Sequence, residues 1–141
     1  MMIARLCPVD YHRFHFPDSG SMVERYTLSG KFHSVNPVAL KAQPTIFLEN
    51  ERCVSILKTD NFGYLAYVEV GALCVGKIVQ STNEMVRFER GQEKGYFLFG
   101  GSTVIVLGEK GKWLPDSDIL ENTRKGHETF IKLGACIGKT R

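Results

Sequence analysis

The sequence predicts a mainly β (α+β) fold, in which short antiparallel strands form a compact barrel or sandwich with a few short helices. Runs rich in β-branched and aromatic residues dominate the chain, and all of them are short. Glycine, asparagine and aspartate separate many of these runs, as expected for turns. Helical patterns are confined to two places, so the helices are additions to a β framework.

The expected strands follow one another from the middle of the chain onward. Residues 59–63 contain Asp, Asn and Gly and suit a hairpin turn between two of the strands. Gly71 suits a bend or bulge between the second and the third strand. The last two strands are separated by Gly100-Gly101-Ser102. The expected strands are residues 53–58, 64–70, 72–79, 96–99 and 103–107.

Two short helices are expected. The first begins after Asn36, a favourable N-cap residue, with Pro37 at the first helical position, where its missing N–H has no cost. The second covers residues 117–123 and ends near Gly126, since glycine readily adopts the conformation that follows a helix.

Length and charge limit the possible partners. With 141 residues, 43% of them hydrophobic, the chain is expected to form one domain with its own core. The formal net charge is only +3, without blocks of like charge, so nucleic acid is not an expected partner. A weak positive surplus does suit an anionic lipid surface.

The sequence gives no sign of a metal site or of a membrane-spanning segment. The four cysteines lack the spacing of metal ligands, and no histidine stands near them at such a spacing. The first residues lack the apolar region of a signal peptide. The longest apolar stretch, residues 64–79, is interrupted by Glu69 and Lys77. We therefore expect neither a signal peptide nor a transmembrane segment.

Two histidines, His12 and His15, lie close to a carboxylate, Asp10, within residues 10–17. An imidazole titrates near neutral pH and is the usual general acid or base. In a regular strand Asp10, His12 and Phe14 share one face and His15 takes the other, so both histidines reach one site only through a bulge or bend. The alternative, which the pattern alone favours, is that the histidines form only local hydrogen bonds.

Ser102 directly follows two glycines, Gly100 and Gly101, between two apolar runs. Glycine permits an unusual backbone in which Ser102 Oγ approaches the preceding carbonyl carbon, as an N-to-O acyl shift requires. The alternative is a glycine-containing hairpin loop, and the spacing alone favours this loop. The spacing of a phosphate-binding loop is absent. By contrast, residues 49–52 are expected to form a solvated turn.

Taken in order, these motifs resemble the phosphatidylserine decarboxylase family, which depends on a pyruvoyl group. They run through nearly the whole chain, and the Gly-Gly-Ser-Thr form is similar to bacterial and plant-type members. The resemblance implies that residues 1–141 form a single domain, the C-terminal catalytic portion of such an enzyme. The matching motifs are Arg5-Leu6-Cys7-Pro8-Val9-Asp10-Tyr11-His12-Arg13-Phe14-His15, Ser34-Val35-Asn36-Pro37, Glu49-Asn50-Glu51-Arg52, Val70-Gly71-Ala72, Lys94-Gly95-Tyr96-Phe97 and Gly100-Gly101-Ser102-Thr103.

The resemblance implies that Ser102 is the precursor of the pyruvoyl group. Ser102 Oγ attacks the carbonyl of Gly101, and β-elimination of the resulting ester breaks the chain between these two residues. Residues 102–141 then form an α chain that begins with the pyruvoyl group, and residues 1–101 form a β chain. The pyruvoyl ketone forms a Schiff base with the amine of phosphatidylserine and acts as an electron sink. Loss of CO2 leaves a stabilised carbanion equivalent, and its protonation followed by hydrolysis of the Schiff base gives phosphatidylethanolamine.

The family pattern also implies roles for the two histidines. His15 matches the base that acts on Ser102 in self-cleavage, and His12 matches the histidine of the decarboxylation step. The acid of this relay belongs to a segment upstream of Asp10 that is not among the residues of this chain. We therefore expect the domain to be N-terminally truncated, and Asp10 is not assigned the acid's role.

The resemblance implies peripheral contact with an anionic membrane on the cytoplasmic side of the cell membrane. The alternative is a non-catalytic β domain that binds anionic lipid or a partner chain, which the mild positive charge and the missing acid would suit. A biotinyl- or lipoyl-type carrier domain is disfavoured, because no lysine stands at a Met-Lys-Met-like hairpin tip.

Overall fold

The computed structural model describes residues 1–73, 77–82, 87–98 and 101–141. Strands make up most of the regular structure and the helices are short, so the predicted mainly β fold is confirmed. The strands are β1 (Met2–Leu6), β2 (Arg13–His15), β3 (Gly20–Leu28), β4 (Arg52–Thr59), β5 (Gly63–Val70), β6 (Lys77–Gln80), β7 (Arg87–Phe88), β8 (Glu93–Leu98), β9 (Ser102–Gly108), β10 (Trp113–Pro115) and β11 (Gly138–Thr140), and the helices are α1 (Pro37–Ala42), α2 (Ile46–Glu49) and α3 (Ser117–Arg124).

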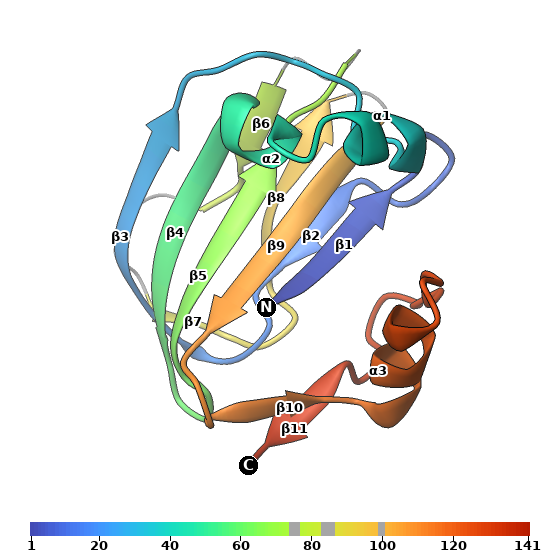
Figure 1. Cartoon of the computed structure of the whole chain (residues 1–141). Coiled ribbons are helices and arrows are strands. Elements are labelled where there is room, and N and C mark those ends of the chain that lie inside the picture. The colour runs from blue at the N-terminus through green and yellow to red at the C-terminus, as the bar shows by residue number, and fades with distance from the viewer. Residues whose placement is uncertain (74–76, 83–86, 99–100) are drawn as a thin grey trace.

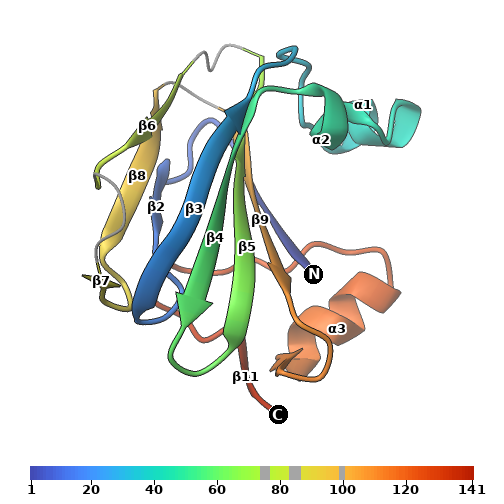
Figure 2. The ribbon, with the colours of Figure 1, turned by 90° about the vertical axis from the view of Figure 1, so that its left-hand side faces the viewer.

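Two sheets face each other. Six strands, in the order β1-β9-β5-β4-β3-β7, form a curled antiparallel sheet (Figure 1). Three further strands, in the order β2-β8-β6, form a small sheet that stands against the concave side of the large one, so that together they make a half-barrel (Figure 2). Strands β10 and β11 pair with each other beside α3.

The main hydrophobic core lies between these two sheets. The ring of Phe14 on β2 lies 5.0 Å from that of Phe97 on β8 and 6.4 Å from that of Tyr67 on β5, centroid to centroid. Burying each such side chain stabilises the fold by roughly 1.5–3 kcal/mol. On the convex face Phe47 of α2 packs against a second cluster, which is formed by Val54, Val68, Val70 and Ile105. The helices at this end therefore cover the outside of the large sheet.

The predicted hairpin of β4 and β5 is confirmed. These strands pair over their full length, and Thr59 Oγ1 donates a hydrogen bond of 2.7 Å to the carbonyl of Gly63 at the turn. The strand expected at residues 72–79 is observed only as β6, and residues 74–76 lie outside the described residues. Strand β3 escaped prediction, because a register shift between Met22 and Glu24 breaks the alternation of its side chains.

Both predicted helices are confirmed. Asn36 caps α1, since its Oδ1 accepts a hydrogen bond of 2.7 Å from the backbone N–H of Ala39, and Pro37 begins the helix. Helix α3 ends at Arg124, and Gly126 follows with a φ of +75°. Helix α2 has only four residues, too few for a helical period to be recognised in the sequence.

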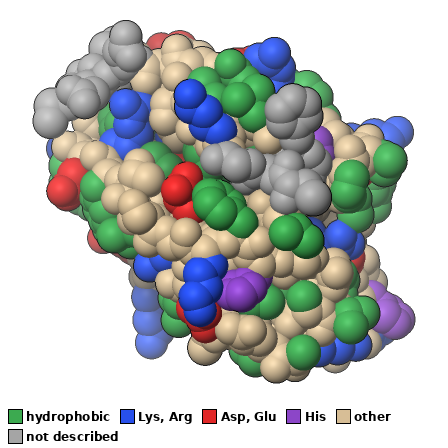
Figure 3. All heavy atoms as spheres, turned by 90° about the horizontal axis from the view of Figure 1, so that it is seen from above, with side chains coloured by type: hydrophobic (Ala, Val, Ile, Leu, Met, Phe, Trp, Pro, Cys, Tyr) green, Lys and Arg blue, Asp and Glu red, His purple; other side chains and the backbone are tan. Residues whose placement is uncertain are grey.

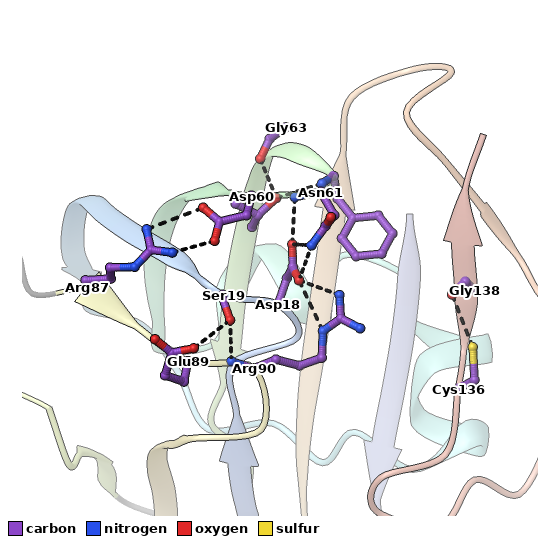
Figure 4. Close-up of polar contacts among 12 residues, drawn as sticks. Asp18, Ser19, Asp60, Asn61, Gly63, Arg87, Glu89, Arg90, Cys136 and Gly138 are labelled. Atoms are coloured by element: carbon purple, nitrogen blue, oxygen red, sulfur yellow. Dashed lines mark hydrogen bonds and ion pairs between the residues drawn. The ribbon is translucent and has the colours of Figure 1, made fainter.

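A buried aspartate ties three loops together at the end of the sheets near the β4–β5 turn (Figure 4). Asp18 is 1% exposed, and its carboxylate accepts hydrogen bonds from the backbone and side chain of Asn61 and from the guanidinium of Arg90. Burial alone raises the pKa of Asp18, but the hydrogen bonds from Arg90 and Asn61 outweigh it, so the pKa lies below its usual value. Asp18 is therefore a charged structural residue.

Asp18→Asn is expected to make stability less sensitive to acid. A carboxyl with a lowered folded pKa stabilises the fold above its unfolded pKa of 3.8, and this contribution is lost as pH falls through the lower folded pKa. The variant should be less stable by about 1–3 kcal/mol near neutral pH, and the difference should shrink as the pH falls below about 4. Urea unfolding across this pH range measures both. A pH-independent difference would contradict the assignment.

Candidate active site

Ser102 is the first residue of β9 and is fully buried. Strand β9 pairs on both sides, with Ser102 opposite Leu6 of β1 and Thr103 opposite Val70 of β5. Gly101 has a φ of +82°, which residues with a side chain rarely adopt. The glycine therefore lets the chain turn into β9 directly before the serine.

The hairpin interpretation of residues 100–102 is wrong. Strand β8 pairs with β2 and β6, whereas β9 pairs with β1 and β5, so the two strands belong to different sheets. Phe99 and Gly100 lie outside the described residues. The chain crosses from the small sheet to the large sheet between Leu98 and Ser102, and Ser102 is the first residue on the far side.

A turn after β1 reverses the chain near Ser102. Strand β1 ends at Leu6, opposite Ser102. The backbone N–H of Cys7 then donates to Asp10 Oδ2 (2.7 Å), and the N–H of Asp10 donates to the carbonyl of Cys7 (2.9 Å). The carboxylate of Asp10 is thus engaged in stabilising this turn.

His12 is the histidine that meets Ser102. Its carbonyl accepts a hydrogen bond of 2.9 Å from the N–H of Phe97, which attaches this part of the chain to β8. Its Nδ1 lies 3.2 Å from Ser102 Oγ. In the tautomer with the proton on Nε2, Nδ1 accepts the hydroxyl proton, as a general base does. Nε2 is buried and has no hydrogen-bond partner among the described residues.

His15 lies on the other face of β2. Its Nδ1 is 2.9 Å from the carbonyl of Gly91, and because a carbonyl only accepts, Nδ1 carries the proton. Nε2 is then free to accept from Tyr11 Oη at 3.0 Å, and the two rings are stacked. The register shift between β2 and β8 places its extra residue, Lys94, on β8, so β2 keeps its alternation. The described contacts join His15 to Tyr11 and Gly91, not to Ser102.

Arg13 also points away from Ser102. It forms an exposed ion pair of 2.7 Å with Glu93 and lies over the ring of Tyr96. Hydrogen bonds from Ser81 and Arg13 hold the pKa of Glu93 below its usual value. The polar groups of residues 10–15 are therefore divided between a surface network and a buried contact with Ser102.

Asn50 is a buried residue that the sequence analysis placed in a solvated turn. Its side chain is fully buried, accepts from the N–H of His33 and donates to the carbonyls of His33 and Gly71. The expectation was wrong because an amide can satisfy buried backbone groups as well as water does. Asn50 fixes the segment after β5, next to the start of β9.

The described residues offer hydroxyl and imidazole chemistry. Within these residues no three His, Cys, Asp or Glu side chains are grouped as metal ligands. A buried serine after a positive-φ glycine, with an imidazole against its hydroxyl, is a site for activating a serine. The fold and this site together define a mainly β protein in which a buried serine contacts an imidazole where the chain passes from one sheet to the other.

The comparisons identify the family. The family model described as phosphatidylserine decarboxylase matches residues 1–138, so the chain belongs to the phosphatidylserine decarboxylase family. A phosphatidylserine decarboxylase proenzyme of Clostridium tetani is 52% identical over 138 residues, which are 98% of this chain and 46% of the relative. Proenzymes of the same name from Clostridium beijerinckii and Ruminiclostridium cellulolyticum are each 49% identical over 137 residues, 97% of this chain and 46% of each relative. The chain thus spans about half the length of these relatives.

Gly95→Ala is expected to disturb the site from a distance. Gly95 lies opposite Phe14, and an added Cβ would approach the Phe14 ring to 2.7 Å and meet the carbonyl of Val79. The cost of such overpacking is typically about 1–3 kcal/mol and it would push β8, with His12, away from its neighbours. Thermal unfolding measures the loss. Gly91→Ala, where a Cβ meets nothing within 4 Å but φ is +79°, controls for backbone strain. A Gly95→Ala variant as stable as the parent chain would contradict the packing argument.

Proposed function

We propose that this chain carries the self-processing and catalytic site of a phosphatidylserine decarboxylase. The observation that carries the proposal is the contact between His12 Nδ1 and the buried hydroxyl of Ser102, directly after a positive-φ glycine. The names of the relatives support it, because a proenzyme is cut to become active. The proposed substrate is phosphatidylserine, and the products are phosphatidylethanolamine and CO2.

In the proposed maturation, Ser102 Oγ attacks the carbonyl carbon of Gly101 and the peptide bond becomes an ester. A base then removes the Cα proton of residue 102, the Cβ–O bond breaks, and Gly101 leaves as a carboxylate. The dehydroalanine at position 102 takes up water and releases ammonia, which leaves a pyruvoyl group on residues 102–141. The positive φ of Gly101 supports this scheme, since it permits an unusual approach of the hydroxyl.

The residues around position 102 suit a pyruvoyl group. Its ketone withdraws electrons from the carbon that loses CO2 in a bound amino acid head group. His12 contacts position 102 and is suited to hold or deliver the proton that replaces CO2. The family assigns self-cleavage to His15, whose described contacts are with Tyr11 and Gly91. For His15 to act on Ser102, the outer face of β2 would have to turn inward.

The acid of the proposed relay is a residue other than Asp10. The Asp10 carboxylate already accepts the N–H of Cys7. By the family pattern the base of this relay is His15, and the acid comes from a segment that is not among the residues of this chain.

We also propose peripheral contact with an anionic membrane on the cytoplasmic side. The net charge is +3, and Val38, Leu48 and Leu73 are 77%, 70% and 60% exposed. Basic and hydrophobic side chains lie beside one another on the coloured part of the end seen in Figure 3. None of the helices in the described parts of the chain combines the length and apolar character needed to cross a bilayer. Flotation with phosphatidylserine vesicles tests this contact, and recovery of the chain in the pellet alone would argue against it.

Ser102→Ala is expected to abolish processing, because alanine lacks the attacking oxygen. The parent chain should appear by intact mass as two chains, with residues 102–141 beginning in a pyruvoyl group, and should release CO2 from phosphatidylserine. The variant should remain one chain of 15.9 kDa. Thr103→Val, which removes the neighbouring buried hydroxyl, is the matched control and should still be cleaved. A parent chain that stays whole would reject self-processing and favour a non-catalytic domain that binds lipid or a partner chain.

Single alanine variants separate the two histidines. By the family assignment, His15→Ala should stay uncut, whereas His12→Ala should be cut but lose decarboxylation by on the order of 10²–10⁴-fold, because a general acid or base is removed. Intact mass and CO2 release measure the two steps separately. His33→Ala is a control at a histidine whose described hydrogen bonds and ion pair join it to Asn50 and Glu49. If His12→Ala stayed uncut and His15→Ala did not, the base role would pass to His12, the imidazole that touches Ser102.

A further inference from the structure

A lysine and a glutamate form a fully buried ion pair between the two sheets. Lys94 on β8 and Glu69 on β5 are each 0% exposed, and Lys94 Nζ lies 2.6 Å from Glu69 Oε1. Lys94 also donates to Gln80 Oε1 of β6 (2.8 Å), and its ammonium lies over the rings of Phe14 and Tyr67. The self-processing scheme uses none of these groups.

Lys94 is buried because of an irregularity in the small sheet. Arg13 pairs with Tyr96 and Phe14 with Gly95, but His15 pairs with Glu93, so Lys94 is the extra residue of a β-bulge. The extra residue of a bulge shifts the alternation of side chains along its strand, so a residue that would face solvent can face the core. Glu93 therefore faces the surface ion pair, while Lys94, its neighbour, points into the core.

The glutamate end of the pair is close to Ser102. Glu69 lies opposite Val104 on β9, and Val104 packs against the main core. Ser102 is two residues before Val104 and so faces the same side. Diagonal neighbours on paired strands are roughly 7–8 Å apart, so Glu69 neighbours Ser102 on the concave face.

The lysine end of the pair lies on β8, the strand that holds the backbone of His12. Lys94 lies three residues before Phe97 on β8, and the N–H of Phe97 holds the carbonyl of His12. The pair thus connects the strand that holds His12 to the strand that flanks Ser102. His12 and Ser102 belong to different sheets, and their contact depends on how these sheets are placed.

We propose that the Lys94–Glu69 ion pair is a positioning device, which sets the small sheet against the large sheet so that His12 meets residue 102. This inference rests on the proposed function. Well-packed apolar residues would stabilise a core as well as or better than a buried pair, whereas a short, directional contact fixes a geometry. The burial of Glu69 raises the pKa of its carboxyl and the Lys94 ammonium opposes that rise, so the two charges need each other.

The double variant Lys94→Met/Glu69→Leu tests the proposal, because it removes both charges and keeps an apolar core. Thermal stability should stay close to that of the parent chain. CO2 release per processed chain should nevertheless fall on the order of 10- to 100-fold in kcat, with KM little changed, because misplacement of a catalytic group acts on the chemical step. If kcat changed only in proportion to the loss of thermal stability, the pair would have a purely structural role and the proposal would be overturned.

Two further experiments, a milder variant and a direct NMR measurement, test the proposal if the double variant does not fold. Gln80→Met removes one acceptor of Lys94 and should lower kcat by a smaller factor. Nitrogen-15 NMR of the chain should show a shift at the His12 imidazole in both variants, while the signals of His15, His33 and His127 serve as internal references. An unchanged His12 signal would overturn the proposal.

Asp18→Asn is the matched control, since it weakens the ion pair between the buried Asp18 and the exposed side chain of Arg90. Asp18 contacts Asn61 beyond the Gly63 end of β5, about 20–25 Å along that strand from the Val70 end, which lies beside the start of β9. It should lower stability and leave kcat and the His12 signal unchanged. If the parent chain were never processed, the proposed function would fail for this chain, and the NMR comparison alone would decide whether the ion pair positions His12.

Discussion

The pairing of β9 on both of its edges is the constraint on which the rest of the structure depends. Ser102 lies at the first position of a strand that is hydrogen-bonded to β1 on one side and to β5 on the other. A strand held on both sides has little freedom to slip, because a shift of one residue would reverse every side chain of β9 between the core and the convex face. The register therefore fixes Ser102 on the concave side.

His12, the other residue of the site, is held by the small sheet. The contact between His12 and Ser102 therefore depends on the relative position of the two sheets. The Cys7–Asp10 turn returns the chain from β1 to β2, and β8 holds the backbone of His12. The packing of Phe14 of the small sheet against Tyr67 of the large sheet is an apolar contact between the sheets, and apolar contacts are not directional. Among the described residues, Lys94–Glu69 is a directional contact between the two sheets in which both side chains are fully buried.

Local signals could be predicted from the sequence, and long-range pairing could not. The cap at Asn36 and the hairpin turn at residues 59–63 depend on neighbouring residues, and both were predicted. The glycines and the family motifs singled out Ser102 as a site residue. The same glycine spacing suits either a hairpin or a crossover between sheets, and the strand order in the structure shows that it is a crossover. The side chain of Lys94 points into the core because of a β-bulge. The sequence does not reveal this bulge, because a lysine in a strand is normally expected on the exposed face.

The burial of Ser102 suits the order of events in the proposed maturation. An ester formed between Gly101 and Ser102 can react in two ways. Hydrolysis would cut the chain and leave an ordinary serine at position 102, whereas elimination leads to the pyruvoyl group. Exclusion of water from a closed site suppresses the first and leaves the second to a nearby base. Ser102 is 0% exposed and contacts an imidazole, so the uncut chain has both conditions. In this scheme the elimination frees the carboxylate of Gly101, and water adds to the dehydroalanine after that irreversible step.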